Sequence, residues 1–419
     1  MTAPQFKSGF LSNFVARGAY FDCTDPGALD GLLHKELVTA YIGFDCTAPS
    51  LHVGHALQIM TLRRLQQAGH RPIVLIGGGT TKVGDPSFRN EARPLLSDEQ
   101  IETNKLAILK TFQNFLTFGD GPSDAILIDN AEWLDKLEYI PFLREIGRHF
   151  SIGRMLSMES VRAKLDNDLP FSFLEFNYMI MQAYDFVELY RRYGCLLQSS
   201  GSDQWGNIVG GIDLGRRVAN VQLFGLTTPL ITTSSGAKMG KTAAGAVWLN
   251  PEMRSPYDYW QFWRNTEDAD VGRFLRLFTD LPEDEIGRLE SLRGAELNDA
   301  KKTLATEATI LCHGRTQALA AAETARRTFE EGTMAEGLPT FEIARATLET
   351  GIAIANLAQL AGLTGSTGEA RRHIQGGGLR LNDTVVGDVK ATVGISDIAP
   401  QGVIKLSIGR KKHILVKPV

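Results

Sequence analysis

The sequence YIGFDCTAPSLHVGH occupies residues 41–55, and this stretch decides the fold. A β-like apolar run over residues 37–42 precedes a loop that contains Pro49, and a helix-like segment then continues as far as Gly69. A glycine just past the last turn is a common helix stop. A strand, a loop and a helix in this order form the repeating unit of a parallel sheet with crossover helices.

Three more β-like runs extend this pattern through the first half of the chain. They lie at residues 73–76, 125–128 and 195–198. A second helix-like segment, residues 178–193, ends at Gly194. The alternation predicts an α/β fold built on a doubly wound, Rossmann-like parallel sheet. Ligands of such sheets bind beyond the carboxyl ends of the strands, so we expect the chemistry in the loops after Ile42, Ile76 and Gln198.

The second half of the chain predicts two further folding units. Residues 257–328 mix large apolar side chains with charges and lack β-like alternation, which predicts an α-helical domain. Residues 330–340, EEGTMAEGLPT, contain glycines and a proline with few apolar anchors and are typical of a linker. Two helix-like segments and short β-like runs follow, which predicts a small α+β domain. The expected boundaries are residues 1–230, 231–330, 331–345 for the linker, and 346–419.

The composition is that of an ordinary globular protein in a reducing compartment. Charged residues make up 22% and aromatic residues 8%, near globular averages, and the longest apolar runs are far short of a membrane span. The cysteines are scattered without a C-x-x-C pair, so we expect neither a disulfide framework nor a zinc site. Residues 1–19 contain no continuous apolar segment followed by a cleavage site, so we expect no secretory signal and a cytoplasmic location.

The net charge of −4 hides an uneven distribution. Residues 340–419 carry 10 Lys and Arg against 6 Asp and Glu, whereas the rest of the chain carries 34 against 42. A basic C-terminal part behind an acidic body suggests a module that binds a polyanion. A solvated basic face explains the same charge about equally well.

The segment GAKMGKT at residues 236–242 is a near miss to the phosphate-binding P-loop, G-x-x-x-x-G-K-[ST]. Gly240, Lys241 and Thr242 fit that pattern, but Ser235 stands where the first glycine belongs, so the tight turn would be missing. We therefore disfavour a P-loop. Two lysines on a glycine-containing loop can instead follow negative charge as it moves onto a phosphate leaving group.

Two histidines, His52 and His55, stand at the predicted helix start with Gly54 between them. A helix start supplies unpaired backbone N–H groups and the positive end of the helix dipole, which suits phosphate oxygens. Gly54 would let a ligand approach the backbone closely. Taken alone, however, histidines at a helix start are more often capping or core groups than ligands.

Tyr178, Gln182 and Asp185 are four and three residues apart, and hence lie on one face of the predicted helix. Polar groups on an otherwise apolar helix need partners. A satisfied buried network and a stripe that binds a ligand both explain this spacing.

Together these segments resemble the signatures of one enzyme family. HVGH resembles the HIGH signature of class I aminoacyl-tRNA synthetases, with Val53 in place of isoleucine, and KMGKT at residues 238–242 resembles their KMSKS loop. YMIMQAYD at residues 178–185 and GSDQWGN at residues 201–207 resemble the tyrosyl-tRNA synthetases of bacterial type. The resemblance covers essentially the whole chain. It implies activation of L-tyrosine with ATP, followed by transfer of the tyrosyl group to tRNA.

The resemblance implies a role for each site residue. The residues implied for catalysis on the phosphates are Thr47, His52, His55, Arg89, Arg93, Lys238 and Lys241. Those implied for tyrosine binding are Tyr41, Asp85, Tyr178, Gln182, Asp185 and Gln204. Those implied for ATP binding are Gly43, Asp45, His52, His55, Gly201, Asp203, Lys238, Lys241 and Thr242. In this assignment Tyr178, Gln182 and Asp85 bind the α-ammonium group. Asp185 accepts a hydrogen bond from the phenolic hydroxyl, beside Tyr41.

The C-terminal segment EARRHIQGGGLRLN at residues 369–382 resembles an S4-like RNA-binding domain. A helix with paired arginines, a glycine turn and a short strand offers guanidinium groups to an RNA backbone. The implied tRNA-binding residues are Arg371, Arg372 and Arg380. The family resemblance also implies an anticodon-binding role for the helical domain and a homodimer. Its interface candidates are an insertion around residues 130–170 and Phe173.

Several positions depart from the better-known family pattern. Ile42 stands where some members keep a cysteine near the ribose, and Arg89 stands where a lysine is common. The stretch GGGTTK at residues 77–82 is an unusual version of the family's loop and implies no role for Lys82. Magnesium is expected to arrive with ATP, because no cluster of carboxylates has the spacing of a dedicated metal site.

The same residues argue against three alternative functions. Tryptophanyl-tRNA synthetases share the fold and both signatures, but Tyr41 together with Asp185 argues against them. An RNA-binding protein with a defunct active site is disfavoured by the intact histidines and lysines. A dehydrogenase is excluded, because the glycines at residues 77–79 do not continue as G-x-G-x-x-G into a helix.

Overall fold

The computed structural model describes residues 5–87, 93–236, 239–242, 245–329, 338–409 and 412–419. Among these residues the largest sheet has six strands in the order β1-β6-β5-β2-β3-β4. The strands are β1 Asp22–Cys23, β2 Thr39–Asp45, β3 Arg71–Gly77, β4 Ile126–Asp129, β5 Cys195–Gly201 and β6 Phe224–Thr228. All neighbours pair in parallel except β1 and β6. The predicted α/β fold with a parallel sheet is confirmed, with an antiparallel edge strand added.

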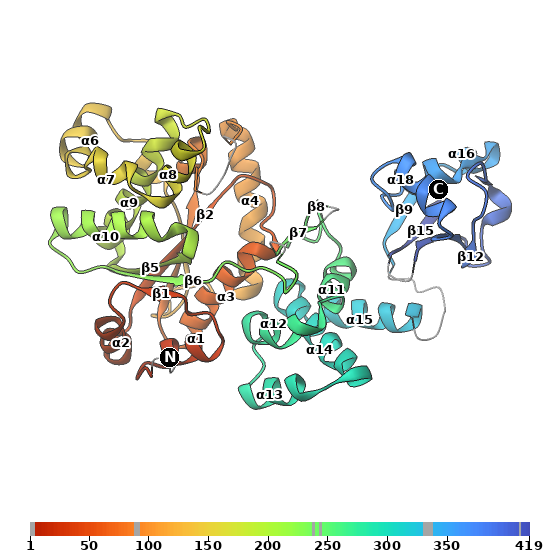
Figure 1. Ribbon diagram of the computed structural model, residues 1–419, viewed down its shortest axis with the longest axis horizontal. Coiled ribbons are helices and arrows are strands. Elements are labelled where there is room, and N and C mark those ends of the chain that lie inside the picture. Colours follow the sequence, from red (N-terminus) through yellow and green to blue (C-terminus); the bar gives the residue numbers. More distant parts are fainter. Residues whose placement is uncertain (1–4, 88–92, 237–238, 243–244, 330–337, 410–411) are drawn as a thin grey trace. The chain divides into compact units, whose positions relative to one another are not determined.

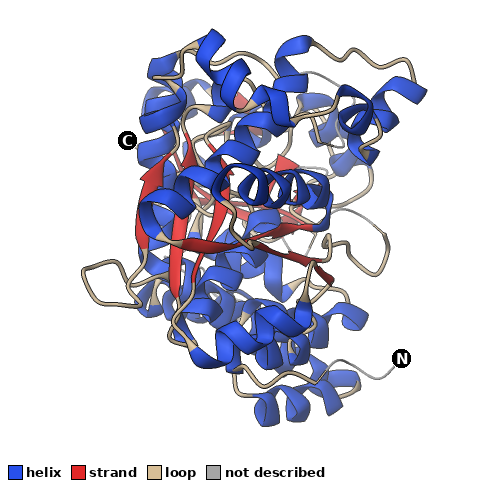
Figure 2. Ribbon diagram, turned by 90° about the vertical axis from the view of Figure 1, so that its left-hand side faces the viewer, coloured by secondary structure: helices blue, strands red, loops and turns tan. Residues whose placement is uncertain are grey.

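Helices cover both faces of this sheet, as Figures 1 and 2 show. On one side lie α3 Val53–Gln67 and α4 Asp98–Phe115, and on the other side lie α9 Phe173–Tyr193 and α10 Trp205–Ala219 (Figure 1). From β2 the chain passes to β3 and β4, and it then returns to β5 on the opposite side of β2. The winding therefore reverses between β2 and β5, which opens a crevice at the carboxyl ends of these two strands.

The sequence explains where the main helices begin and end. Ser97 and Ser172 accept hydrogen bonds from backbone N–H groups three residues on, and so cap α4 and α9. Gly194 ends α9 with a φ of 63°, a left-handed conformation that glycine adopts without strain. Phe186 of α9 is fully buried and meets the ring of Tyr41 on β2 edge-on, with centroids 5.2 Å apart. This contact joins the helix to the sheet at the floor of the crevice.

Four short helices occupy the fully described stretch between β4 and α9. They are α5 Ala131–Leu134, α6 Tyr139–Glu145, α7 Ile152–Leu156 and α8 Glu159–Asp166. Lys164 and Glu175 form an ion pair of 2.9 Å there, with side chains only 3% and 6% exposed. Buried charges are tolerated only with further hydrogen bonds, and Ser172 supplies two of them to Glu175. The pair ties this insertion to the start of α9.

The chain divides into two compact units. The first comprises Met1–Lys241, Ala246–Met253 and Thr266–Ala300, and the second comprises Thr242–Gly245, Arg254–Asn265 and Lys301–Val419. Besides the sheet, the first unit contains α1 Gly9–Ala16, α2 Pro26–Lys35, α12 Val271–Phe278 and α13 Glu283–Ser291. It therefore continues past residue 230, where the sequence led us to expect a boundary. Helix α12 joins it because it packs on α3, and α13 in turn packs on α12.

Helices make up most of the part of the second unit that precedes residue 330. Its helical part contains α11 Pro256–Arg264, α15 Arg315–Phe329 and most of α14 Leu297–His313. Tyr259 and Trp263 of α11 are buried and pack edge to face, with ring centroids 6.1 Å apart. The helical character predicted for residues 257–328 is confirmed.

A five-stranded sheet follows in the described C-terminal residues, in the order β12-β11-β14-β15-β9. Its strands are β9 Thr340–Ile343, β11 Leu379–Leu381, β12 Thr384–Val385, β14 Ile404–Ile408 and β15 Lys412–Pro418. The helices are α16 Arg345–Thr350, α17 Ile354–Leu360 and α18 Thr367–Gln375. Because β9 pairs with β15, residues 340–343 belong to this sheet, which corrects the C-terminal end of the expected linker. A core of side chains from Ile343 to Val416 fills this part.

Two further findings concern the chain as a whole. Cys23, Cys46, Cys195 and Cys312 are all buried, and no disulfide joins them. Within the described ranges, no helix combines the length and the apolar character that crossing a bilayer requires.

Candidate functional site

A polar cavity of about 770 Å³ lies at the carboxyl ends of β2 and β5 in the first unit. This volume is within the range of small-molecule sites. The predicted site residues in its lining are Tyr41, Gly43, Asp45, Thr47, His52, His55, Asp85, Arg93, Tyr178, Gln182, Asp185, Gly201, Asp203 and Gln204. The winding of the sheet thus brings together residues that are far apart in the sequence.

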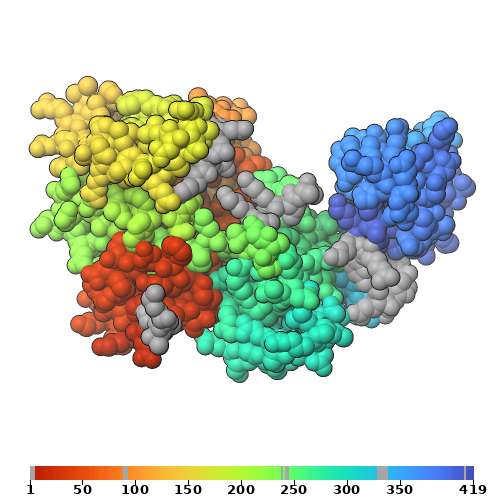
Figure 3. All heavy atoms as spheres, in the orientation of Figure 1, coloured from red at the N-terminus to blue at the C-terminus, as the bar shows by residue number. Residues whose placement is uncertain are grey.

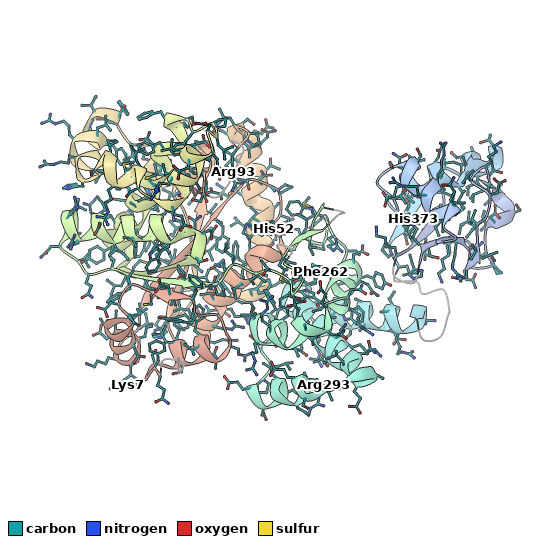
Figure 4. All side chains as sticks on the ribbon, viewed as in Figure 1. Lys7, His52, Arg93, Phe262, Arg293 and His373 are labelled. Carbon is teal, nitrogen blue, oxygen red and sulfur yellow. The ribbon has the colours of Figure 1, made fainter. Side chains whose placement is uncertain are left out.

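The two histidines cap the start of α3, where Figure 4 labels His52. His52 Nδ1 accepts a hydrogen bond from Gly54 N at 3.0 Å, and His55 Nδ1 accepts one from His52 N at 3.2 Å. Because each Nδ1 is an acceptor, each neutral imidazole carries its proton on Nε2. The capping and the ligand-binding interpretations are therefore compatible, because capping orients two rings that also line the cavity.

Asp185 is a buried carboxylate held by two donors. Its Oδ1 accepts from Trp133 Nε1 at 2.8 Å, and its Oδ2 accepts from Asn130 Nδ2 at 3.0 Å. Both partner atoms can only donate, so they hold the carboxylate as an acceptor. Burial raises the pKa of Asp185 to about 7, although the two hydrogen bonds oppose the shift. Asp185 therefore ionises at a pH near neutrality in the ligand-free protein.

Tyr41 Oη and Gln198 Oε1 have no hydrogen-bond partner in the described part of the chain. Both side chains line the cavity and are almost fully buried. Burial, and secondly the charge of Asp185, raises the pKa of Tyr41 well above 10, so its hydroxyl remains protonated. Unpaired buried polar atoms cost free energy. Tyr41 lies near Asp185, so its unpaired hydroxyl indicates a ligand with a polar group at this end.

Asp45 links the end of β2 to α9. Tyr178 Oη donates to its Oδ2 at 3.0 Å, and Thr80 Oγ1 donates to its Oδ1 at 2.8 Å. Burial, reinforced by the charge of Asp85, raises the pKa of Asp45 to about 6. Two carboxylates that repel each other across a cavity favour a cation between them. A ligand with a positive group is therefore expected here.

Asn207 connects three polar side chains of the lining. Its Nδ2 donates to Gln182 Oε1 at 2.9 Å and to Gln204 Oε1 at 3.0 Å. Gln204 Nε2 in turn donates to Asp85 Oδ2 at 2.9 Å. The chain of hydrogen bonds sets the direction of these side chains before any ligand binds.

The lysine segment, residues 236–242, reaches the start of α3. Gly240 has a φ of 88°, and a Cβ there would lie 2.8 Å from Gly54 N. Lys241 and Thr242 form the short strand β7, of which the backbone alone is described. Two other predicted residues, Arg89 and Lys238, lie outside the described residues. The two signature segments nevertheless meet at Gly54 and Gly240.

Lys82, for which no role could be predicted, is held by two carboxylates. Its Nζ lies 2.9 Å from Asp135 and 3.2 Å from Asp98. The hydrogen bonds that Lys82 donates to Asp135 are the main cause of its raised pKa. These ion pairs connect the segment after β3 with α4 and with the end of α5, so Lys82 has a structural role.

Sequence reasoning missed five residues that contact the predicted ones. They are Thr80, Asn130, Trp133, Gln198 and Asn207. Asn130 directly follows β4, and the rule that sites lie at strand ends could have found it. Asn207 lies within the GSDQWGN segment. Gln198 lies inside a buried strand and carries no sequence signal.

The three arginines predicted to bind tRNA lie in the second unit. Arg371 and Arg372 are exposed on α18, next to His373, which Figure 4 labels. Arg380 is exposed on β11, where its Nη1 donates to the carbonyl oxygen of Asp383 at 3.0 Å. As for metals, no group of three or more His, Cys, Asp or Glu side chains in the described ranges could hold an ion.

Comparisons with known proteins agree on one family. Residues 34–330 match the family described as tRNA synthetases class I (W and Y). The chain is 60% identical over 413 residues to the tyrosine–tRNA ligase of Nitrobacter winogradskyi, with 99% of each chain covered. It is 61% identical over 418 residues to that of Rhodopseudomonas palustris, with 100% of each covered. A solved structure, a C-terminally truncated mitochondrial tyrosyl-tRNA synthetase of Aspergillus nidulans, is similar at 30% identity and a TM-score of 0.70, over 77% of this chain and 94% of that one.

Proposed function

The chain belongs to the class I tRNA synthetases of the tryptophan and tyrosine group, and from this premise we propose how its residues perform the reaction of a tyrosine–tRNA ligase. Tyrosine and ATP give tyrosyl-adenylate and pyrophosphate, and the tyrosyl group then passes to the terminal ribose of tRNA. In the first step the substrate carboxylate attacks the α-phosphate in line, so no protein nucleophile takes part. The protein then catalyses the step by positioning tyrosine and ATP and by stabilising the negative charge that develops on the phosphates.

The observation that carries the choice of tyrosine is the combination of Asp185 with Tyr41. A phenolic hydroxyl can donate to the fixed acceptor Asp185 and accept from the buried hydroxyl of Tyr41. The indole of tryptophan can only donate, and phenylalanine can do neither. Either substrate would leave a buried polar atom unpaired, which costs about 1–3 kcal/mol. This asymmetry favours tyrosine over tryptophan.

The α-ammonium group of tyrosine is assigned to the middle of the cavity. Tyr178, Gln182 and Asp85 receive it there, and Gln204 orients Asp85. Asp45, assigned to ATP on the sequence alone, also bears on this position because it is hydrogen-bonded to Tyr178. Its charge, added to that of Asp85, attracts the cation.

The phosphates of ATP are assigned to the start of α3 and the lysine segment. His52, His55 and Thr47 supply donors beside the positive end of α3. Arg93 lines the cavity and is assigned to the phosphates, and Arg89, Lys238, Lys241 and Thr242 are proposed to contribute to the same task. Gly43, Gly201 and Asp203 also line the cavity, and we assign them to adenosine. Magnesium is proposed to enter with ATP.

The second unit is proposed to bind tRNA. Its last part would act as an S4-like module through Arg371, Arg372 and Arg380, and the helical part preceding it would contact the anticodon arm. Support comes from the exposure of all three arginines and from the separate core of residues 343–416. Phosphate contacts of this kind are strongly salt-dependent.

We also propose a homodimer that acts in the cytoplasm. Support for the dimer comes from large apolar side chains exposed around the insertion between β4 and α9, whose atoms appear in orange and yellow in Figure 3. They are Tyr139, Ile140, Ile152, Leu156, Leu165, Phe173 and Leu174. Exposed apolar clusters of this kind are typical of protein interfaces. Sedimentation of Phe173→Glu tests this proposal: the variant should be monomeric, and an unchanged dimer would contradict it.

Pyrophosphate exchange tests the substrate. We expect tyrosine to stimulate exchange of label between pyrophosphate and ATP, and the other standard amino acids, tryptophan included, to leave it near the background. Stimulation by tryptophan rather than tyrosine would contradict the assignment of Asp185 and Tyr41 to the phenol.

A further inference from the structure

The lysine segment is anchored to an element outside the cavity. We term residues 232–235, which directly precede it, the stem. Ser234 N donates to Asp270 Oδ2 at 2.7 Å. The hydroxyl groups of Ser234 and Ser235 donate to the two carboxylate oxygens of Glu267 at 2.7 and 2.8 Å. These contacts hold the stem at the start of α12.

The two acidic residues bind the stem in different environments. Asp270 is only 3% exposed, and both of its oxygens are used, one by the stem backbone and one by Arg273 at 3.1 Å. Arg273 also donates to the carbonyl oxygen of Thr232, which closes a ring of contacts around the stem. Glu267 is exposed to solvent, and its bonds to the two serines lower its pKa. Hydrogen bonds to ionised groups are stronger than neutral ones.

The other end of α12 is attached to α3, the helix that begins at the two histidines. Arg64 of α3 is 4% exposed, and its Nη2 donates at 2.7 Å to the carbonyl oxygens of Arg276 and Leu277. Burial lowers the pKa of Arg64 to about 9, so it still carries its charge at neutral pH. A cation at the last carbonyls of a helix is favourable. Helix α12 therefore connects α3, with which it is in contact, to the stem (Figure 1).

We propose that Glu267 and Asp270 are positioning residues for tyrosine activation, because through α12 they hold the stem of the lysine segment at a fixed place relative to the histidines of α3. This inference rests on the proposed function. The lysines and the histidines are assigned to the same triphosphate, and neither acidic residue lines the cavity or touches the substrate. A small displacement of the stem would misplace the lysines when charge moves onto pyrophosphate, and errors of about 1 Å can cost about a hundred-fold in rate.

The first test compares the exposed carboxylate of Glu267 with the half-buried carboxylate of Glu290, both of which contact the region of α12. Glu267→Ala removes the bonds to the two stem serines. Glu290→Gln instead removes the charge that Arg276 of α12 pairs with, and it leaves the stem contacts intact. We expect Glu267→Ala to lower the single-turnover rate of adenylate formation about ten-fold, with unchanged tyrosine affinity and melting temperature. Glu290→Gln should retain the rate, and Glu267→Gln, which keeps hydrogen-bonding atoms, should recover most of it.

A double-mutant cycle keeps the proposal testable without disturbing the buried Asp270. In protein that already carries Ser234→Ala and Ser235→Ala, Glu267→Ala should have little further effect, because the partners of Glu267 are gone. An unchanged rate in Glu267→Ala, or equal losses in Glu267→Ala and Glu290→Gln, would overturn the proposal. Failure of the parent protein to show tyrosine-dependent exchange would instead overturn the proposed function, so the two failures are distinguishable.

Discussion

The Asp185 side of the cavity and the His52 side are built in different ways. Asp185 accepts hydrogen bonds from Asn130 and Trp133 within the core of the sheet-bearing body. The Tyr41 hydroxyl lies near it without a hydrogen-bond partner. On the other side, the start of α3 meets a segment from beyond β6 at Gly240. The first arrangement is complete before a ligand binds, whereas the second depends on two segments meeting.

This difference indicates that recognition of the substrate hydroxyl and stabilisation of phosphate charge occur on separate sides of the cavity. A pocket that recognises a hydroxyl group is more specific when its hydrogen-bond acceptor is fixed in direction. A buried and rigid acceptor meets this requirement. The phosphate side must stabilise charge that moves during the reaction, so its donors come from a helix start and a separate lysine segment. Changes on the first side should therefore alter substrate choice, and changes on the second should alter rate.

Replacing Asp185 by Ala should have the largest effect on tyrosine use. The change removes the acceptor and leaves the donors of Asn130 and Trp133 unpaired. The value of kcat/KM for tyrosine should therefore fall roughly a hundred-fold or more, which corresponds to about 3 kcal/mol of transition-state stabilisation. Glu188→Gln is the control, because Glu188 is a buried carboxylate on the same helix that pairs with Arg191 and Arg192 outside the cavity. Exchange assays with tyrosine and phenylalanine measure both variants. Equal proportional losses for the two amino acids would show that Asp185 is structural.

His52→Asn should slow activation without weakening tyrosine binding. An asparagine oxygen can still cap Gly54 N, but the variant lacks the Nε2 donor assigned to phosphate. We expect a loss of about 2 kcal/mol, roughly thirty-fold, in the single-turnover rate. His52→Ala should be slower still, because it also loses the cap. A raised dissociation constant for tyrosine with a normal rate would show that the phosphate side is misassigned.

Acidification should weaken tyrosine binding through Asp45. A carboxyl with a pKa of about 6 gains a proton as the pH falls through that value and loses its attraction for the ammonium group, so KM for tyrosine should rise about ten-fold from pH 7 to pH 5. Asp45→Asn should have a high KM that depends less on pH in this window than the KM of the parent does. A parent KM that stays constant between pH 7 and pH 5 would contradict the role of Asp45.

The same group predicts how stability depends on pH. Because the folded pKa of Asp45 is raised, its contribution to the free energy of unfolding is present at acidic pH and is lost as the pH rises through about 6. Its partners, the hydroxyls of Tyr178 and Thr80, can turn to donate or accept. Asp45→Asn should therefore unfold at a higher denaturant concentration than the parent at pH 8, and at a similar one at pH 4.

Two glycines of the lysine segment can be compared to test its contact with the start of α3. Gly236 and Gly240 have similar φ values of 85° and 88°, but an added Cβ meets nothing within 4 Å at Gly236 and lies 2.8 Å from Gly54 N at Gly240. Alanine at either position carries the backbone cost of about 1–2 kcal/mol. Only Gly240→Ala should also disturb the contact with α3, so its activation rate should be several-fold lower than that of Gly236→Ala. Equal rates would show that the contact is unimportant.

Removal of residues 340–419 should have the smallest effect on activation. Apart from Thr242, the described residues assigned to the small substrates belong to the first unit, and the removed part has its own core. Pyrophosphate exchange should be unchanged, while KM for tRNA should rise and its salt dependence should fall. Normal charging of tRNA would contradict the role of the three arginines. Loss of exchange would show that the removed part is needed for folding of the rest.

Much of the site could be predicted because its residues lie in short, recognisable segments at strand ends and helix starts. The spacing of Tyr178, Gln182 and Asp185 predicted one helix face, and all three line the cavity. The residues that fix Asp185 could not be found in this way, since Asn130 and Trp133 become its neighbours only when β4 packs beside β3 and α9 crosses the sheet. Similarly, β9 could not be predicted, because it lies within the expected linker and forms only by pairing with β15 near the end of the chain.

The division between recognition and activation is tested most directly by combining Asp185→Ala with His52→Asn. If the two sides act independently, the losses in kcat/KM for tyrosine-dependent exchange, expressed as free energies, should add to within about 0.5 kcal/mol. The double variant should then combine the altered substrate choice of one single variant with the slow chemical step of the other. A coupling of more than about 1 kcal/mol between the two changes would contradict the account, because it would show that both residues act on the same step through a shared structure.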